Sequence, residues 1–353
     1  MTKSLPLHFN PSPLPNPCWP ALPLLLLVIL ASAGCEQPSG APTGSGRQTA
    51  SAGPDASPPA EPSPPADSTA APVGDVSAAA FAGDNAPRAT DAGGGSASQA
   101  ISTPDQLAAA LKEKNPGFSG EVQMQPVSAD LLALVINDPN LKDISPLARQ
   151  RIGLLDLSKC DLTDLSALRG LPLDQLYLED NARLTDISAL RGMPLQKLYL
   201  SRTRVENLGP LRGAPLEELN LLGASVKDLS PLAECPLKML WLTGCPVADI
   251  SPLRRVPLVS LTLQDTRVAD LSPLAGTALQ RLHIGGTEVT DLTPLASLRL
   301  TRLIFTPGKI KAGLDVVRQM TSLQELGTRF DDTADDKMPP ATFWELYDKG
   351  ELK

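Results

Sequence analysis

The sequence predicts an α/β solenoid. This is a coil of short repeats with a parallel β-sheet on its concave face and short 3₁₀ turns on its convex face, preceded by a disordered N-terminal region. Three observations support this fold class. A phrase of alternating leucines occurs nine times, at intervals of 21 residues and once of 22. A second phrase, Asp-Leu-Ser-Pro-Leu, recurs between these copies and leaves no room for a long helix. A long segment poor in large apolar residues precedes the first copy.

The first phrase reads Leu-x-x-Leu-x-Leu, and its last apolar residue serves here as the anchor of each repeat. The anchors are Ile136, Leu157, Leu178, Leu200, Leu221, Leu242, Leu263, Ile284 and Phe305. Alternate residues of a strand point to one face, so Leu219 and Leu221 both face the core. A fixed period over nine copies predicts that successive turns stack their strands in parallel, about 4.8 Å apart.

The second phrase marks the convex side of each repeat. A serine followed by proline favours a helix start, with the serine as the cap and the proline in the first turn. Copies begin at Asp228, Asp249 and Asp270, with Ile250 in place of the first leucine in the second of them. We expect one short 3₁₀ turn per repeat.

These repeats, over about 131–310, resemble leucine-rich repeats, specifically the short internalin-like variety. Three flanking segments, Asn-Pro-Gly-Phe at 115–118, Gly-Leu-Asp-Val-Val-Arg at 313–318 and Phe-Trp-Glu-Leu-Tyr-Asp at 343–348, resemble leucine-rich-repeat regions of planctomycete-type bacteria. Some such relatives are fused to protein kinase domains, but this sequence has no Gly-rich phosphate loop, His-Arg-Asp or Asp-Phe-Gly motif. The resemblance implies an inward-facing polar ladder, three residues past each anchor, that bonds the backbone of the adjacent turn. Its positions are Cys160, Asn181, Thr203, Ala224, Cys245, Thr266 and Thr287.

The N-terminal segment is predicted to be an export signal. The apolar run over 22–33 is shorter than the ~20 residues that span a bilayer, and it ends in small residues. Small residues followed by Cys35 resemble the lipobox of bacterial lipoproteins, which implies that Cys35 is acylated, although Ser32 stands where that family prefers leucine. By the same analogy, Glu36 directly after the cysteine favours sorting of the lipoprotein to the outer membrane. The alternative is an ordinary cleaved signal with an incidental cysteine.

The chain divides into five predicted regions: a lipoprotein-type signal peptide at 1–34, a linker at 35–100, an N-terminal cap at 101–130, repeats at 131–311 and a C-terminal cap at 312–353. The linker consists mostly of Ala, Pro, Gly and Ser and buries too little surface to fold. We expect a tether with a span of roughly 45 Å.

The caps close the two open ends of the coil. The N-terminal cap has a predicted helix at 104–114, started by Thr103, and a strand within 118–125. The C-terminal cap has a predicted helix at 312–320, a last strand near Leu323 and Leu326, and a solvated acidic loop at 331–336. A final helix at 342–348 places Trp344 and Tyr347 over the core.

The composition argues against catalysis and against a metal site. The chain has two histidines, only one of them beyond the signal, and neither a paired-Cys motif nor a Gly-x-Ser-x-Gly elbow. We therefore expect no catalytic residue, no metal and no cofactor, with Cys160, Cys235 and Cys245 unpaired. A net charge of −8 disfavours nucleic acid as a partner.

The concave sheet is the predicted binding surface. The outward position before each anchor holds Asp156, Tyr177, Tyr199, Asn220, Trp241, Thr262 and His283, which include three of the six Tyr and Trp residues of the chain. Aromatic side chains on a rigid sheet are typical binding anchors. We expect a protein or peptide ligand at Tyr177, Tyr199, Asn220, Trp241 and His283, with Lys197 and Arg281 beside them. The alternative is that β-propensity alone places aromatics there, in a structural or scaffolding envelope protein.

Overall fold

A computed structural model of the protein describes residues 103–128, 130–331 and 334–352. The predicted signal peptide, Cys35 and the linker lie outside these residues. All described residues belong to one compact unit.

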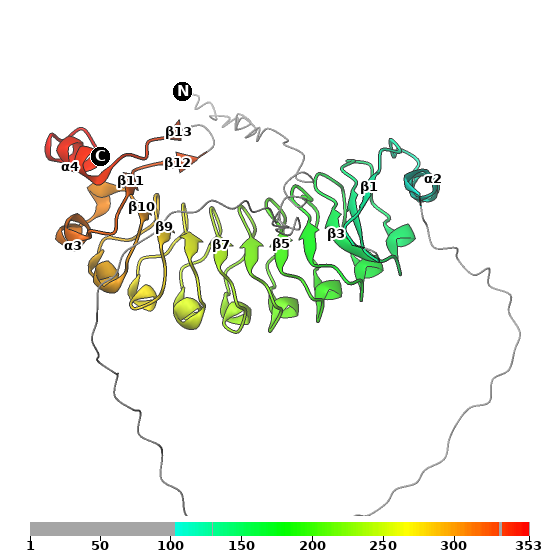
Figure 1. Cartoon of the computed structure of the whole chain (residues 1–353), viewed down its shortest axis with the longest axis horizontal. Helices are drawn as coiled ribbons and strands as arrows, with labels where there is room; N and C mark the ends of the chain where they lie inside the picture. The colour runs from blue at the N-terminus through cyan, green and yellow to red at the C-terminus, as the bar shows by residue number, and fades with distance from the viewer. Residues whose placement is uncertain (1–102, 129, 332–333, 353) are drawn as a thin grey trace, which may run out of the picture. The chain divides into compact units, whose positions relative to one another are not determined.

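An 11-stranded sheet runs through this unit, with its strands in chain order from β1 to β11 (Figure 1). From β2 onward all neighbours are parallel, whereas β1 pairs with β2 antiparallel. The strands are β1 (Gln123–Pro126), β2 (Leu132–Val135), β3 (Ile152–Asp156), β4 (Gln175–Tyr177), β5 (Lys197–Tyr199), β6 (Glu218–Asn220), β7 (Met239–Trp241), β8 (Ser260–Thr262), β9 (Arg281–His283), β10 (Arg302–Ile304) and β11 (Glu325–Gly327). The predicted solenoid is confirmed.

The core follows the leucine phrase. Leu219 and Leu221 are both 0 % exposed, and every anchor from Ile136 to Phe305 is buried. Their side chains join one continuous apolar cluster that reaches from the N-terminal helix to the C-terminal one. The predicted inward face is therefore confirmed in each repeat.

Short 3₁₀ helices lie on the side of the coil opposite the strands (Figure 1). They are η1 (Ser145–Leu147), η2 (Ser166–Leu168), η3 (Ser188–Leu190), η4 (Gly209–Leu211), η5 (Ser230–Leu232), η6 (Ser251–Arg255), η7 (Ser272–Leu274), η8 (Thr293–Ser297) and η9 (Pro307–Lys309). The predicted role of serine as the cap is wrong, because the serine is already the first helical residue. The aspartate two residues earlier does the capping. Asp228 accepts the Ser230 backbone N–H at 2.8 Å through Oδ1 and the Ser230 hydroxyl at 2.9 Å through Oδ2.

Each strand is followed by a sharp turn. The residue two positions after the anchor has a positive φ in seven successive repeats: Lys159 (61°), Asp180 (62°), Arg202 (57°), Gly223 (68°), Gly244 (71°), Asp265 (56°) and Gly286 (73°). Glycine takes this conformation freely, whereas the other residues hold it at a cost.

The next position forms the polar ladder that the resemblance implied, and it uses two bonding modes. Asn181 donates to the carbonyls of Leu157 in the previous turn (2.9 Å) and Leu178 in its own (3.0 Å). Cys245 donates to Leu221 of the previous turn at 3.0 Å. The threonines depart from the expectation, because each bonds the anchor carbonyl of its own turn, as Thr203 does to Leu200 at 2.7 Å.

The N-terminal cap docks through its helix and one buried asparagine. Helix α2 (Pro104–Lys114) forms as predicted and buries Leu107 and Leu111, whereas the strand begins later than expected, at Gln123. Asn115 donates to the Asp143 carbonyl at 2.8 Å and accepts the backbone N–H of Lys142 at 2.9 Å. These bonds attach the cap to the first repeat.

The C-terminal cap contains α3 (Leu314–Gln319), β12 (Phe330–Asp331), β13 (Ala334–Asp335) and α4 (Pro340–Asp348). The predicted acidic loop is in part a hairpin, because β12 and β13 pair antiparallel. Phe343 of α4 is buried against Phe305, with ring centroids 5.5 Å apart. Trp344 belongs to the core cluster and Tyr347 packs against it, so the predicted cover over the core is confirmed, and the two rings meet edge to face at 5.7 Å.

Candidate binding face

The parallel register brings the outward residues of the strands into one line, which we name the concave column. Its members are Asp156, Tyr177, Tyr199, Asn220, Trp241, Thr262 and His283, each paired directly with the next across β3 to β9. Since each residue alternates with buried leucines, the whole column lies on the face away from the core.

Three rings of this column form an aromatic stack. The centroids of Tyr177 and Tyr199 lie 4.9 Å apart, and those of Tyr199 and Trp241 lie 6.2 Å apart. Tyr199 and Trp241 are on β5 and β7, so their contact passes over Asn220 of β6. Both ring pairs are tilted, by 36° and 38°. Separations and tilts of this kind are favourable for aromatic pairs.

Hydrogen bonds fix the tyrosine hydroxyls. Tyr199 donates to Glu218 Oε2 at 3.1 Å, while Lys197 Nζ lies 2.9 Å from Glu218 Oε1. Tyr177 donates to Gln175 Oε1 at 3.1 Å. Lys197, which the sequence placed beside the column, is therefore paired with Glu218.

Burial differs along the column. Tyr177 is 8 % exposed and His283 is 6 % exposed, so the expectation of open side chains is wrong for these two. Tyr177 is covered because it packs with Ala133 and Leu154 of the preceding strands as well as with Tyr199. Tyr199 and Trp241 remain half-buried and present ring surface.

The surroundings of the aromatic stack are acidic. Burial and the Glu218 carboxylate raise the pKa of both tyrosine hydroxyls, so the rings stay neutral. Burial also raises the pKa of Glu179, against the opposing effects of Ser201 and Arg202. Sequence reasoning missed Glu179. It lies directly after its anchor, and the alternation of the strand predicts that this position shares the face of the column.

The remaining predicted residues form a second group. Arg281 and His283 are on β9, separated from Trp241 on β7 by strand β8. Arg281 pairs across the sheet with Arg302, which bonds Glu325. Asn220 uses its Oδ1 to accept the backbone N–H of Leu222 at 3.1 Å. The seven predicted binding residues thus share one face of the sheet but form two separate groups on it.

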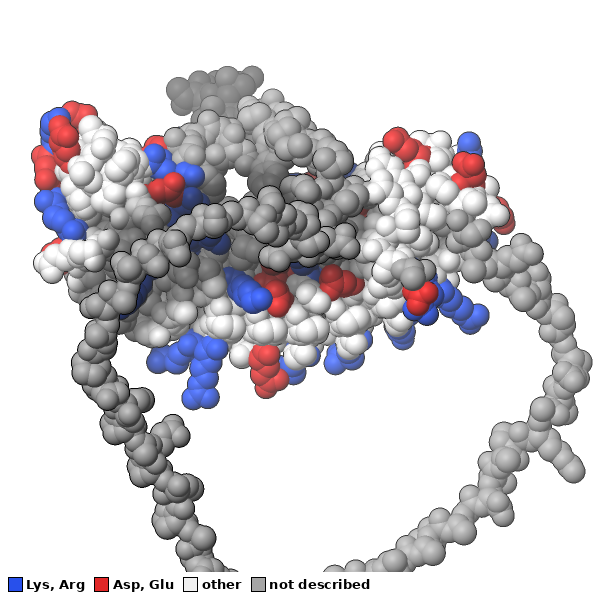
Figure 2. All heavy atoms as spheres, in the orientation of Figure 1, with Lys and Arg blue, Asp and Glu red and all other residues white. Residues whose placement is uncertain are grey.

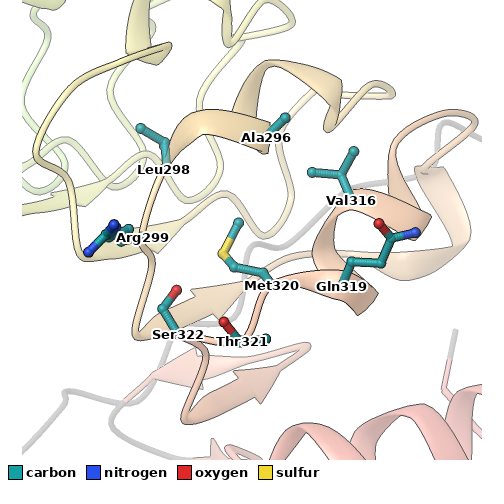
Figure 3. Close-up of a pocket in the computed structure, with 8 residues that line it drawn as sticks. All are labelled: Ala296, Leu298, Arg299, Val316, Gln319, Met320, Thr321 and Ser322. Carbon is teal, nitrogen blue, oxygen red and sulfur yellow. The ribbon is translucent and has the colours of Figure 1, made fainter.

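A separate hollow lies at the C-terminal end of the coil, between η8 and α3. Figure 3 shows the Met320 side chain near its centre, with Leu298 and Val316 on either side. Arg299 is the one charged residue in its lining. This lining offers neither an acid–base pair nor a set of metal ligands, so the concave column is the stronger candidate.

Several features are absent from the described residues. They contain no group of three His, Cys, Asp or Glu side chains that could hold a metal ion. Cys160, Cys235 and Cys245 are free and buried there. No helix within 103–128, 130–331 and 334–352 is long and apolar enough to cross a bilayer.

These features define the class of protein. Repeats with one short parallel strand, an inward-facing turn residue and one 3₁₀ helix make this chain a leucine-rich-repeat solenoid. No protein-family model and no curated protein matches it.

Solved structures with similarity to this chain come from bacteria and plants. An internalin (InlF) from Listeria monocytogenes is 26 % identical, with a TM-score of 0.47 over 62 % of this chain and 73 % of that one. Internalin C2 from the same bacterium is 25 % identical, with a TM-score of 0.45 over 57 % and 92 %. The ectodomain of the Arabidopsis thaliana receptor kinase GASSHO1/SCHENGEN3, in complex with CASPARIAN STRIP INTEGRITY FACTOR 2, is 17 % identical, with a TM-score of 0.41 over 52 % and 27 %. Since these TM-scores lie below 0.5, the fold assignment rests on the sheet and repeats described above.

Proposed function

We propose that this protein is a non-enzymatic component of a bacterial cell envelope that binds a protein or peptide on its concave sheet. The observation that carries the proposal is the aromatic stack. Tyr199 and Trp241 present half-buried rings on a rigid sheet, where side-chain ordering costs little on binding. Tyr177 packs against Tyr199 from the neighbouring strand, and Glu218 accepts the Tyr199 hydroxyl.

Ligand specificity in this proposal comes from the polar groups around the rings. Asn220 lies between the strands of Tyr199 and Trp241, and Lys197 lies on the strand of Tyr199. Arg281 and His283 extend the surface by two strands, a distance of about 10 Å. An extended segment that crosses the strands would reach both groups, whereas a small molecule would reach one.

The test compares Tyr199→Ala/Trp241→Ala with Thr262→Ala, which changes the same column outside the stack. Each full-length variant is immobilised and exposed to envelope extract, and the captured proteins are identified by mass spectrometry. We expect the double variant to lose partners that the wild type and Thr262→Ala retain. If the double variant keeps the same partners while remaining folded, the concave face is not the binding site.

A structural or scaffolding role without a discrete ligand is the second candidate. The mutual packing of the three rings and the burial of Tyr177 favour it, since such a stack also stiffens the sheet. In that case Tyr199→Ala/Trp241→Ala lowers the melting temperature, and the wild type captures no partner that the variant lacks.

The proposed location is the outer membrane, through acylation of Cys35. The short apolar run and the small residues before Cys35 support this proposal. We expect Cys35→Ser to move the protein from the membrane fraction to the soluble fraction. Unchanged fractionation would show that the cysteine is not the anchor.

A further inference from the structure

A line of arginines follows the outer side of the coil. An arginine follows the last leucine of the 3₁₀ segment in four repeats, and a fifth arginine follows the last of them. Three of these arginines come directly after η2, η3 and η4, whereas the last two are the final residues of η6. We name this set the arginine ridge: Arg169, Arg191, Arg212, Arg254 and Arg255. All five side chains are exposed.

The ridge is ordered by the backbone. Arg169, Arg191 and Arg212 end their 3₁₀ helices with nearly identical backbone angles, φ of −55° to −57° and ψ of 122° to 125°. Since successive repeats are stacked in register, these three side chains leave the coil in the same direction. The ridge spans four repeat intervals, at least roughly 19 Å, because repeats lie about 4.8 Å apart at the sheet and wider outside it.

The ridge arginines make no direct contact with an acidic side chain among the described residues. None of the five side chains forms an ion pair or a hydrogen bond in residues 103–128, 130–331 and 334–352. The capping aspartates of the following repeats lie within electrostatic reach. The pKa of Asp228 is lowered mainly by hydrogen bonds from Ser230 and further by Arg212, and the pKa of Asp270 is lowered mainly by hydrogen bonds from Ser272 and further by Arg254. Ala233 interrupts the ridge and Glu234 follows it. Figure 2 shows basic side chains, with acidic ones among them, projecting from the edge that carries the 3₁₀ helices.

The side chains of the arginine ridge indicate which class of partner it can bind. Val127 is the one exposed large apolar residue of the described chain, so the ridge has no hydrophobic core for a protein interface. Guanidinium groups bind phosphate oxygens in bidentate fashion. A row of such groups suits a surface that carries many phosphates. Nucleic acid fits less well, since the ridge carries no aromatic or amide side chain to contact bases and the net charge is −8.

We propose that the arginine ridge docks the solenoid onto an anionic bilayer surface through lipid phosphates. Binding is peripheral and electrostatic, with no side chain inserted into the hydrocarbon. The 3₁₀ side faces the bilayer, so the sheet on the other side stays open. The site is therefore independent of both Cys35 and the concave column.

The experiment uses the full chain with Cys35→Ser, which removes any acyl anchor. Vesicles of phosphatidylcholine with roughly 30 % phosphatidylglycerol are compared with pure phosphatidylcholine by co-sedimentation, because anionic lipid supplies the attraction. We expect binding to the anionic vesicles at low salt, loss of that binding at about 0.5 M NaCl, and none to the neutral vesicles.

Charge-matched variants locate the site. Arg169→Ala/Arg191→Ala/Arg212→Ala should weaken vesicle binding about a hundredfold, at roughly fivefold per arginine. Arg183→Ala/Arg204→Ala/Arg267→Ala removes the same charge from the strand-to-3₁₀ connections and should change binding less than about fivefold. Circular dichroism checks folding, and the ridge variant should melt close to the wild type because it loses no direct ion pair or hydrogen bond, only the attraction of Arg212 for Asp228.

Three results would overturn the proposal. They are equal losses in the two triple variants, equal binding to neutral vesicles, and binding to a DNA duplex but not to anionic vesicles.

Discussion

The polar ladder shows how one position accommodates several side chains. The Asn181 side-chain amide engages four backbone groups, since Nδ2 also donates to the Glu179 carbonyl at 3.5 Å and Oδ1 accepts the Leu162 N–H at 3.1 Å. Cys245 and Thr203 each satisfy one carbonyl, and Ala224 satisfies none. The ladder is therefore strongest where the extra residue of the 22-residue repeat lies, beside Asn181.

The Asn181 amide should contribute measurably to stability. Asn181→Ala leaves buried carbonyls and one N–H without a partner, so we expect a loss of about 3 kcal/mol in the free energy of unfolding. Asn207→Ala is the control, because Asn207 is exposed and accepts one bond, from the Gly209 N–H. Its expected cost is about 1 kcal/mol or less. Guanidinium unfolding measures both, and equal losses would contradict a special role for the buried ladder.

The ladder thiols should make the fold sensitive to alkali. Burial raises the pKa of Cys160 to about 11 and that of Cys245 to about 12, from an ordinary value of 9.0. A raised folded pKa means that the stabilisation is complete below pH 9 and is lost as pH rises toward 11, because the unfolded thiols ionise first. Unfolding free energies between pH 8 and pH 11 should fall more steeply for the wild type than for Cys160→Ala/Cys245→Ala. Tyr177 and Tyr199 are present in both proteins, so the difference isolates the thiols, and parallel profiles would refute the thiol effect.

At the scale of elements, the junction between the repeats and α3 depends on one glycine. Gly313 has φ +81°, and a Cβ there would lie 2.4 Å from the Thr293 nitrogen and 2.6 Å from the Leu292 carbonyl carbon. Both are backbone atoms of the neighbouring repeat, which cannot move without shifting η8. The start of α3 is thus positioned by close backbone contact.

A pair of glycine substitutions separates backbone strain from steric contact. Gly276 has a similar φ of +75°, but nothing lies within 4 Å of its Cβ position. Gly276→Ala should cost about 1 kcal/mol for the positive φ alone. Gly313→Ala should cost a further 1–3 kcal/mol from overpacking. Thermal unfolding of the two variants gives the comparison, and similar melting temperatures would show that the junction adapts freely.

The whole molecule is a one-dimensional stack, in which each repeat contacts its neighbours and the ends need covers. The C-terminal cover is aromatic. Phe343 lies on Phe305 and against Trp344, while Arg318 lies 4.6 Å from the Trp344 ring centroid and pairs with Asp348. Damage to a cover should therefore remain local to its end of the coil.

Phe343→Ala tests this locality. Removal of the buried ring should destabilise the C-terminal end by about 3–5 kcal/mol. Amide hydrogen exchange should become faster in β10 and β11 and stay unchanged in β4 and β5. Uniformly faster exchange across all strands would mean that the solenoid unfolds as a single cooperative unit.

The concave column shows how far sequence reasoning extends. The residues in the column, their common face and their order followed from the period of the repeats. Their individual states did not follow, since Tyr177 is buried by Ala133 and Leu154, and Lys197 is neutralised by Glu218. These outcomes depend on side chains from neighbouring turns, roughly one repeat away in the chain. The ridge arginines could have been found from the recurring Leu-Arg pairs at 168–169, 190–191, 211–212 and 253–254.

The sequence by itself determined the coil, the buried face of each strand, the 3₁₀ helices and most of both caps. Each of these features depends on a local sequence pattern that recurs in every repeat. A substitution in one copy therefore does not hide the pattern. The tertiary structure alone decided which side chains meet: the contact of Tyr199 with Trp241 over β6, the capping of serine by aspartate, and the close approach at Gly313. Such contacts depend on the directions of side chains and on the sizes of their neighbours in adjacent turns. The sequence of a single repeat does not specify either.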